Sequence, residues 1–252
     1  MKSLTNCLAG AFLFALAAPL ATSPALAQSA EAPAQQADGF DRMLEAITSD
    51  TMSELIFERD FRTVFIAVIK ADPEMTQIEA DCPGYVEGLG NALRPIMRVS
   101  HDYDWQWYRR EFEALMRSGL SEEHAAGIAD LFGSPLGQRF IAAAIANSNA
   151  DATVAAIGDD PDAAITMDAL QADKSATARA VIDALSPEDM NEFATRMREA
   201  EWLPTFMRIQ PRLEALQLEL ANRDFTPEHG AEFDKVLANY SSDQLEACYG
   251  GK

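Results

Sequence analysis

Residues 120–140, LSEEHAAGIADLFGSPLGQRF, constrain the fold more than any other stretch of the chain. Ser121 is a residue type that caps helix N-termini, and the two glutamates after it occupy the first turn, where the helix dipole favours negative charge. Gly133 is expected to end this helix. Ser134 then caps a second helix, and Pro135 takes its first position, which tolerates a missing N–H. The stretch therefore predicts two helices joined by a tight corner.

The corner also contains a serine after a glycine, a feature of many hydrolases. The spacing around Ser134 differs from Gly-x-Ser-x-Gly, however, and no strand precedes it. We interpret Ser134 as a helix cap and Gly137 as the residue that lets the two helices pack closely. Gln138 can hydrogen-bond to backbone groups across the corner. These residues predict a structural motif rather than an active site.

The spacing of apolar residues is helical along nearly the whole chain, and no segment alternates apolar and polar residues as a half-buried strand does. Thr51 is expected to cap one of the helices, with Glu54 as its capping-box partner. The apolar stripe of that helix consists of Phe57, Phe61, Val64, Phe65 and Val68. The pattern predicts an all-α fold, an irregular multi-helix bundle built from antiparallel helical hairpins.

Helix boundaries elsewhere follow from proline, glycine and capping residues. We expect a helix from Tyr85 that is kinked by Pro95 and, after further helical turns, stops at Gly119. The remaining predictions are an alanine-rich run to Ile157, helices over residues 161–172 and 175–185, kinked helices around Pro204 and Pro211, and a last helix capped by Ser241. The composition break after Ile157 divides the chain into two predicted subdomains, 39–157 and 158–252, the second packed on the first.

One capping design occurs three times in the chain. Ser121, Ser186 and Thr226 each follow an apolar residue and precede an acidic residue in the first helical turn. A degenerate two-fold repeat of a helical hairpin would produce this pattern. Ordinary capping chemistry that recurs by chance would produce it equally well, and the sequence leaves both interpretations open.

The first residues have the pattern of a cleaved export signal. Lys2 precedes an apolar stretch, and Ala25-Leu26-Ala27 supplies the small residues that signal peptidase requires, which predicts a signal peptide over residues 1–27. Residues 28–38 are rich in Ala, Gln and Pro, so we expect a disordered leader. No later run is expected to cross a bilayer. The predicted product is a periplasmic protein without an integral membrane segment.

The chain is strongly acidic, with 20 Lys+Arg against 40 Asp+Glu and a formal net charge of −20. This charge repels phosphate backbones and anionic lipid headgroups, and therefore argues against binding to nucleic acid or to a membrane surface. Solvated acidic helix faces explain the composition well.

Two cysteines, Cys82 and Cys248, remain after the predicted signal peptide. In an oxidising compartment they are expected to pair, and the chain-entropy model assigns a bridge of this length on the order of 5 kcal/mol. The alternative is a pair of separate thiols.

Titratable residues offer few candidates for chemistry. His101 and Asp104 lie in a polar cluster beside two tryptophans, which makes them the place to look for a base. His124 and His229 both occupy the third helical position after a cap, where a structural role is favoured over metal binding. A weak cation site built from Glu228, His229 and Glu232 is the alternative for the second of them. Trp107 is predicted to be an exposed aromatic side chain.

The motif in residues 120–140 resembles that of a bacterial family of exported helical domains, domain of unknown function 2059. The matching residues are Leu120, Ser121, Glu123, Phe132, Ser134, Pro135, Gly137 and Gln138. Gly133 replaces the second residue of the family's aromatic pair. The resemblance covers residues 85–147 and implies an all-helical periplasmic domain with no established activity.

The leading functional hypothesis is an exported, non-enzymatic interaction or structural module of the cell envelope, whose partner is an unidentified envelope protein. The second is a carrier that holds a small apolar ligand between helices, with Met190 and Met197 among the lining residues. A hydrolase that uses His101 and Asp104 is third. No cofactor or metal is implied by any motif.

Overall fold

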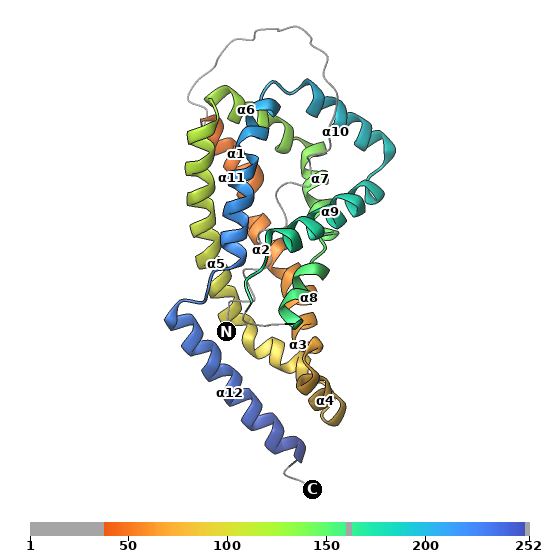
Figure 1. Cartoon of the computed structure of the whole chain (residues 1–252), viewed down its shortest axis with the longest axis vertical. Helices are drawn as coiled ribbons and strands as arrows, with labels where there is room; N and C mark the ends of the chain where they lie inside the picture. Colours follow the sequence, from red (N-terminus) through yellow and green to blue (C-terminus); the bar gives the residue numbers. More distant parts are fainter. Residues whose placement is uncertain (1–37, 160–162, 250–252) are drawn as a thin grey trace.

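The computed structural model describes residues 38–159 and 163–249, and all regular elements within these ranges are helices (Figure 1). This confirms the predicted all-α fold. The helices are α1 (Gly39–Thr48), α2 (Asp50–Asp60), the π-helix η3 (Phe61–Phe65), α3 (Ile66–Ala71), α4 (Pro73–Asp81), α5 (Tyr85–Gly119), α6 (Glu122–Phe132), α7 (Pro135–Ala146), α8 (Asp151–Asp159), α9 (Met167–Ala184), α10 (Pro187–Glu199), α11 (Leu203–Ala221) and α12 (Pro227–Tyr249).

The longest element, α5, spans 35 residues and connects the two ends of the molecule. It contacts α1 and α11 along one part and α12 along another. The helix continues through Pro95 and ends at Gly119, as the sequence predicted. The glycine also has a packing role, because a Cβ there would lie 2.5 Å from Cγ2 of Ile209 on α11.

The largest apolar core lies between α1, α5, α6, α7, α10 and α11. Phe140 of α7 stacks on Phe193 of α10 with ring centroids 4.2 Å apart, and Phe132 of α6 contacts both Phe193 and Trp202. These contacts join residues from both predicted subdomains into a single core. A second core contains apolar side chains of α2, η3, the first half of α5 and α12, and α12 packs on α5.

The three predicted hydroxyl caps are confirmed. Ser121, Ser186 and Thr226 each accept a hydrogen bond from the backbone N–H three residues later, at 3.2, 3.0 and 3.2 Å. The shared design is therefore present in the structure, and both explanations of its recurrence remain open.

Capping near the start of the chain differs from the prediction at one residue. Ser49, rather than Thr51, caps α2 and accepts from the backbone N–H of Met52 at 3.3 Å. Ser49 has the extended backbone that a cap requires, whereas Thr51 already lies inside the first turn. Asp72 follows the last residue of α3 and caps the unpredicted helix α4, because its carboxylate accepts from two backbone N–H groups of that helix.

The alanine-rich run is not one helix. It breaks between α7 and α8, where Asp173 of α9 accepts hydrogen bonds from the backbone N–H groups of Ala152 and Thr153 at 2.9 and 3.0 Å. The N–H of Asn149 donates to the hydroxyl of Thr177, also on α9, at 2.8 Å. A side chain about twenty residues away thus caps α8, which is why the local sequence did not reveal the break.

Two predicted helix boundaries are absent from the structure. Residues 161–172 and 175–185 do not form two helices, because α9 runs without interruption from Met167 to Ala184 behind its cap Thr166. Ser241 does not begin a last helix, since it lies inside α12 and its hydroxyl pairs with that of Tyr85 at 2.8 Å. Pro211 lies inside α11, which spans Leu203–Ala221.

One segment of the described chain, Pro135–Gly158, is long and apolar enough to cross a membrane by length and composition, with a mean hydropathy of 1.3. This corrects the expectation that no run after the signal would pass such a test. A buried helix of a protein core passes the same test. Here the segment is interrupted between α7 and α8, and Phe140 and Ile145 lie in the main core.

Candidate functional site

The corner between α6 and α7 is fixed by short-range hydrogen bonds. The Ser134 hydroxyl donates to the carbonyl oxygen of Leu131 at 2.6 Å and accepts from the N–H of Gly137 at 3.1 Å. The Gln138 amide nitrogen donates to the carbonyl oxygen of Phe132 at 2.7 Å, as the sequence predicted. A Cβ on Gly137 would lie 2.6 Å from Cα of Phe132, so only glycine fits there.

The corner forms one wall of an open groove of ≈ 780 Å³, which we call the corner groove. Its other walls are α1 and α2, and Gln138 joins the two sides by donating to the carbonyl oxygen of Ala46 at 3.3 Å. The larger apolar side chains of the lining come from α2 and α7 and include Leu55, which is 47% exposed. The apolar residues of the lining are Met52, Leu55, Ile141 and Ile145, together with Ala46, Ala129 and Ala142.

The rim of the corner groove is acidic. Asp41, Glu45 and Asp130 contribute three carboxylates, and Arg42 contributes one guanidinium. Arg42 forms an ion pair with Asp130 and thereby links α1 to α6. The four charged rim residues carry two more negative than positive charges, and one of the carboxylates, that of Asp41, is paired with Arg117.

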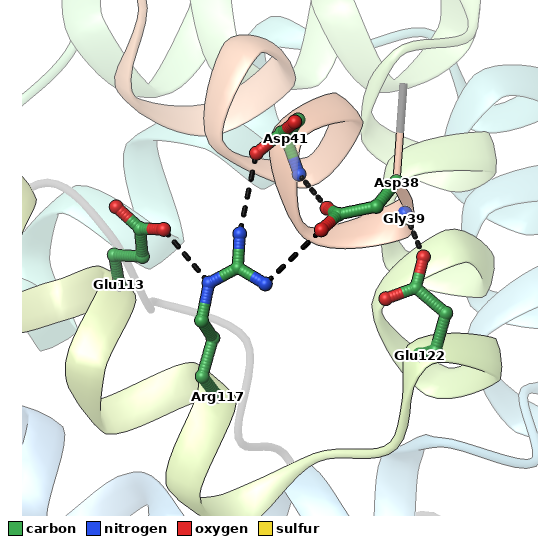
Figure 2. Close-up of polar contacts among 6 residues, drawn as sticks. All are labelled: Asp38, Gly39, Asp41, Glu113, Arg117 and Glu122. Carbon is green, nitrogen blue, oxygen red and sulfur yellow. Dashed lines mark hydrogen bonds and ion pairs between the residues drawn. The ribbon is translucent and has the colours of Figure 1, made fainter. Parts of the chain in front are cut away.

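A clamp around Arg117 holds α1, one wall of the groove, in place (Figure 2). The Arg117 guanidinium donates to Asp38 at 3.1 Å, to Asp41 at 3.2 Å and to Glu113 at 2.7 Å. It also lies over the ring of Phe40, 4.7 Å from the ring centroid. The backbone N–H of Asp41, followed by Arg117, lowers the pKa of the Asp38 carboxyl.

The turn that begins α1 is fixed from α6 as well. Gly39 donates its backbone N–H to the carboxylate of Glu122 (Figure 2). A Cβ on Gly39 would lie 2.6 Å from the Glu122 carbonyl oxygen, so α1 and α6 approach each other closely. Glu122 therefore does more than face the helix dipole, because it also accepts a bond from a segment 83 residues earlier.

The residues predicted as a possible base do not converge. His101 is 4% exposed, and its Nε2 lies 2.9 Å from the Ser53 hydroxyl, between the rings of Phe57 and Trp105. Burial lowers the pKa of His101 from 6.5 to about 4, so the ring is neutral near pH 7. Asp104 is also buried but forms an ion pair with Arg223 at 2.8 Å. Neither side chain lines the corner groove.

The prediction of an exposed Trp107 is wrong. Its ring is half-buried against the main core, and the Arg223 guanidinium covers it at 4.1 Å from the ring centroid. Arg223 is held there by its ion pair with Asp104, a contact between residues 119 positions apart. Tyr103, one turn earlier on α5, is the exposed aromatic side chain instead.

The predicted cation site is not assembled. Within residues 38–159 and 163–249, no group of three or more His, Cys, Asp or Glu side chains is placed to hold a metal ion. Glu232 is bound to Lys235, and His229 packs edge-on against Tyr103. His124 and His229 take part in capping through the backbone, because each donates its N–H to the cap hydroxyl three residues earlier.

The methionines proposed to line a ligand pocket do not share a cavity, since Met197 is buried in the main core and Met190 is half-buried on α10. The phenylalanines of the stripe Phe57, Phe61 and Phe65 stack along one another in the second core. Packing therefore accounts for them.

Cys82 and Cys248 form a disulfide bond with a Cα–Cα distance of 6.0 Å. The bond fastens the end of α12 to the turn before α5. Tyr240 donates to the backbone carbonyl oxygen of Tyr85 at 3.2 Å, and the Tyr249 hydroxyl bonds to Asp81 at 3.0 Å. We call these contacts the α12 attachment.

Sequence reasoning missed the corner groove although it identified one of its walls. Leu55 gives a signal in retrospect, because it lies off the face of α2 that Met52 and Ile56 bury. The pairing of Arg42 with Asp130 had no signal, since the two residues are 88 positions apart.

Comparisons with family models, with curated proteins and with solved structures returned no match to this chain. The resemblance to domain of unknown function 2059 therefore remains a prediction.

Proposed function

We propose that the protein is an exported, non-enzymatic interaction module that binds a segment of a partner protein of the cell envelope in the corner groove. The observation that carries this proposal is a groove with an apolar lining whose walls are joined by hydrogen bonds and ion pairs. The Arg117 clamp fixes α1, and the hydrogen bonds of Ser134 and Gln138 fix the corner. Rigid walls lower the entropic cost of binding, because little of the surface must be ordered.

Exposure of Leu55 supports a binding role. A large apolar side chain that is 47% exposed inside a groove is stabilised when a partner covers it. The residues considered for catalysis support the non-enzymatic part of the proposal, since His101 and Asp104 are each buried with a separate partner.

The sequence and the disulfide support export. The signal-like pattern of residues 1–27 is typical of secreted chains, and stable disulfides such as Cys82–Cys248 persist in oxidising compartments. Mass spectrometry of the mature protein from the periplasm tests this part. We expect cleavage after Ala27, and an uncleaved cytoplasmic chain would contradict export.

Binding is tested by replacing Leu55 with aspartate in a quantitative cross-linking experiment on periplasmic protein. The matched control is Ile182→Asp, because Ile182 is 55% exposed on α9 and does not line the groove. We expect Leu55→Asp to remove specific cross-links while Ile182→Asp keeps them. Equal cross-linking by both variants, with circular dichroism that shows both are folded, would refute the groove as the binding surface.

A further inference from the structure

We infer that the segment bound in the corner groove is an amphipathic helix with a leucine-like apolar face flanked by lysine or arginine. This inference rests on the proposed function and adds the chemistry of the partner. It follows from two features of the groove, the arrangement of its apolar residues and the sign of its rim.

The apolar lining contributes one accessible large side chain from each of two neighbouring helices. Leu55 of α2 is 47% exposed and Ile141 of α7 is half-buried, whereas Met52 and Ile145, three and four residues away from them, line the groove but are buried in the main core. The two helices contact each other, so Leu55 and Ile141 border the same groove. The apolar stripe of a third helix can pack against two such side chains.

The rim selects the charge of the partner. Asp41, Glu45 and Asp130 outnumber Arg42, but Asp130 is paired with Arg42 and Asp41 with Arg117, which leaves Glu45 as the main carboxylate for a partner to pair with. Cationic side chains that flank the apolar face of a bound helix would lie near these carboxylates. Complementary charge of this kind accelerates association and suppresses partners of the wrong sign.

Other occupants fit the groove less well. A second copy of this chain, with a net charge of −20, would bring like charge to an acidic rim. An extended peptide that adds to a sheet has no strand edge to join, because the elements lining the groove are helices with internally paired backbones.

The test uses two synthetic helices with the same leucine face, one with lysine and one with glutamate on its polar face. Binding to the full chain is measured by fluorescence anisotropy at low and at raised salt. We expect the lysine helix to bind at least about fivefold more tightly than the glutamate helix, a preference that salt reduces.

Variants connect the binding to the groove. Leu55→Asp should abolish binding of the lysine helix, and Ile182→Asp should not. Glu45→Lys should weaken it severalfold, whereas Glu111→Lys, which changes an exposed acid on α5 outside the groove, should have a smaller effect.

The outcomes separate this inference from the proposed function. Equal binding of the two helices, or binding of the lysine helix that Leu55→Asp leaves intact, overturns the inference. If Leu55-dependent cross-links to a partner persist when the lysine helix does not bind, the proposed function stands and the chemistry inferred for the partner is wrong. If the lysine helix does not bind and the Leu55-dependent cross-links are also absent, both the inference and the proposed function are overturned.

Discussion

The α6–α7 corner and the α12 attachment are held in opposite ways. At the corner, the hydrogen bonds of Ser134 and Gln138 to nearby backbone join residues three to six positions apart. At the α12 attachment, the bonds join residues 155 to 168 positions apart, and the disulfide closes a separation of 166. The corner can therefore form as soon as its own residues fold, whereas α12 depends on contacts across nearly the whole domain.

The two regions also differ in burial. The corner buries Leu131, Phe132, Leu136 and Phe140 in the main core, whereas α12 buries Phe233 and adds half-buried side chains such as Val236 and Leu237 to the second core. A region with less buried apolar surface opens at lower free-energy cost. We therefore expect the corner to unfold with the whole molecule and α12 to open separately once its covalent bond is removed.

Removal of the disulfide should have the largest effect. In the double variant Cys82→Ser, Cys248→Ser, the chain-entropy model predicts a loss of about 5 kcal/mol in the stability of the attached state. We expect hydrogen exchange to accelerate throughout α12 while the amides of α6 and α7 keep their protection. If α6 and α7 lose protection equally, the two regions unfold as one unit and the comparison fails.

Substitution at the corner should instead destabilise the whole molecule. Gly137→Ala places a Cβ against the backbone of Leu131 and Phe132, and we expect it to cost about 3 kcal/mol. The matched control is Gly158→Ala in α8, where a Cβ meets nothing within 4 Å. Replacing that helical glycine should stabilise the protein by up to about 1 kcal/mol in urea unfolding. A neutral Gly137→Ala would show that the corner can relax.

Acidification should lower the stability of the protein through His101, which lies on α5 between the two regions. Because burial lowers the pKa of His101 to about 4, the unfolded chain binds more protons than the folded one between pH 6.5 and pH 4. Stability contributed by neutral His101 is present above that window and falls by about 3 kcal/mol as the pH decreases through it.

The variant His101→Gln isolates this contribution. Asp60, whose pKa burial raises to about 7, gives the opposite slope, because its stabilisation is lost as the pH rises from about 4 to 7. We therefore expect the difference in unfolding free energy between wild type and His101→Gln to shrink on acidification. A difference that is constant between pH 7 and pH 4 would exclude a depressed pKa at His101.

Removal of single caps should give the smallest effects. Ser134→Ala and Thr226→Ala each delete one hydroxyl that accepts a backbone N–H, a loss of about 1 kcal/mol of helix stability. We expect the first to lower the urea midpoint of the whole protein and the second to appear mainly as faster hydrogen exchange at the start of α12. If both variants shift the urea midpoint equally, α12 unfolds together with the rest of the protein, which its small buried surface does not predict.

The sequence separation between bonded residues also explains how much of the fold could be predicted. The caps Ser121, Ser134 and Ser186 were predictable, because a hydroxyl and the N–H it accepts lie within three residues of each other. The cap of α8 was not, because it is supplied by Asp173 from another helix. Ser49 was missed for a third reason, since two neighbouring hydroxyl residues fit the pattern equally and only the backbone conformation distinguishes them.

The candidate site was predictable only in part. The wall made by Ser134, Gly137 and Gln138 follows from the sequence pattern. The opposite wall depends on which face α1 turns towards α6, and the contact between Arg42 and Asp130 that reflects it has no local signature. Trp107 was predicted to be exposed for the same reason, because Arg223, which covers its ring, lies far away in the sequence.

The anchoring of Gly39 on Glu122 has a consequence for the order of events during synthesis. The two residues are 83 positions apart, so at about 5–20 residues per second α1 waits roughly 4–17 s for its partner helix to be made. During that interval Met43, Leu44 and Ile47, which α1 buries in the finished protein, have no core to enter. The nascent chain therefore exposes an apolar segment until α6 has been made. A holdase chaperone would be most effective in that interval.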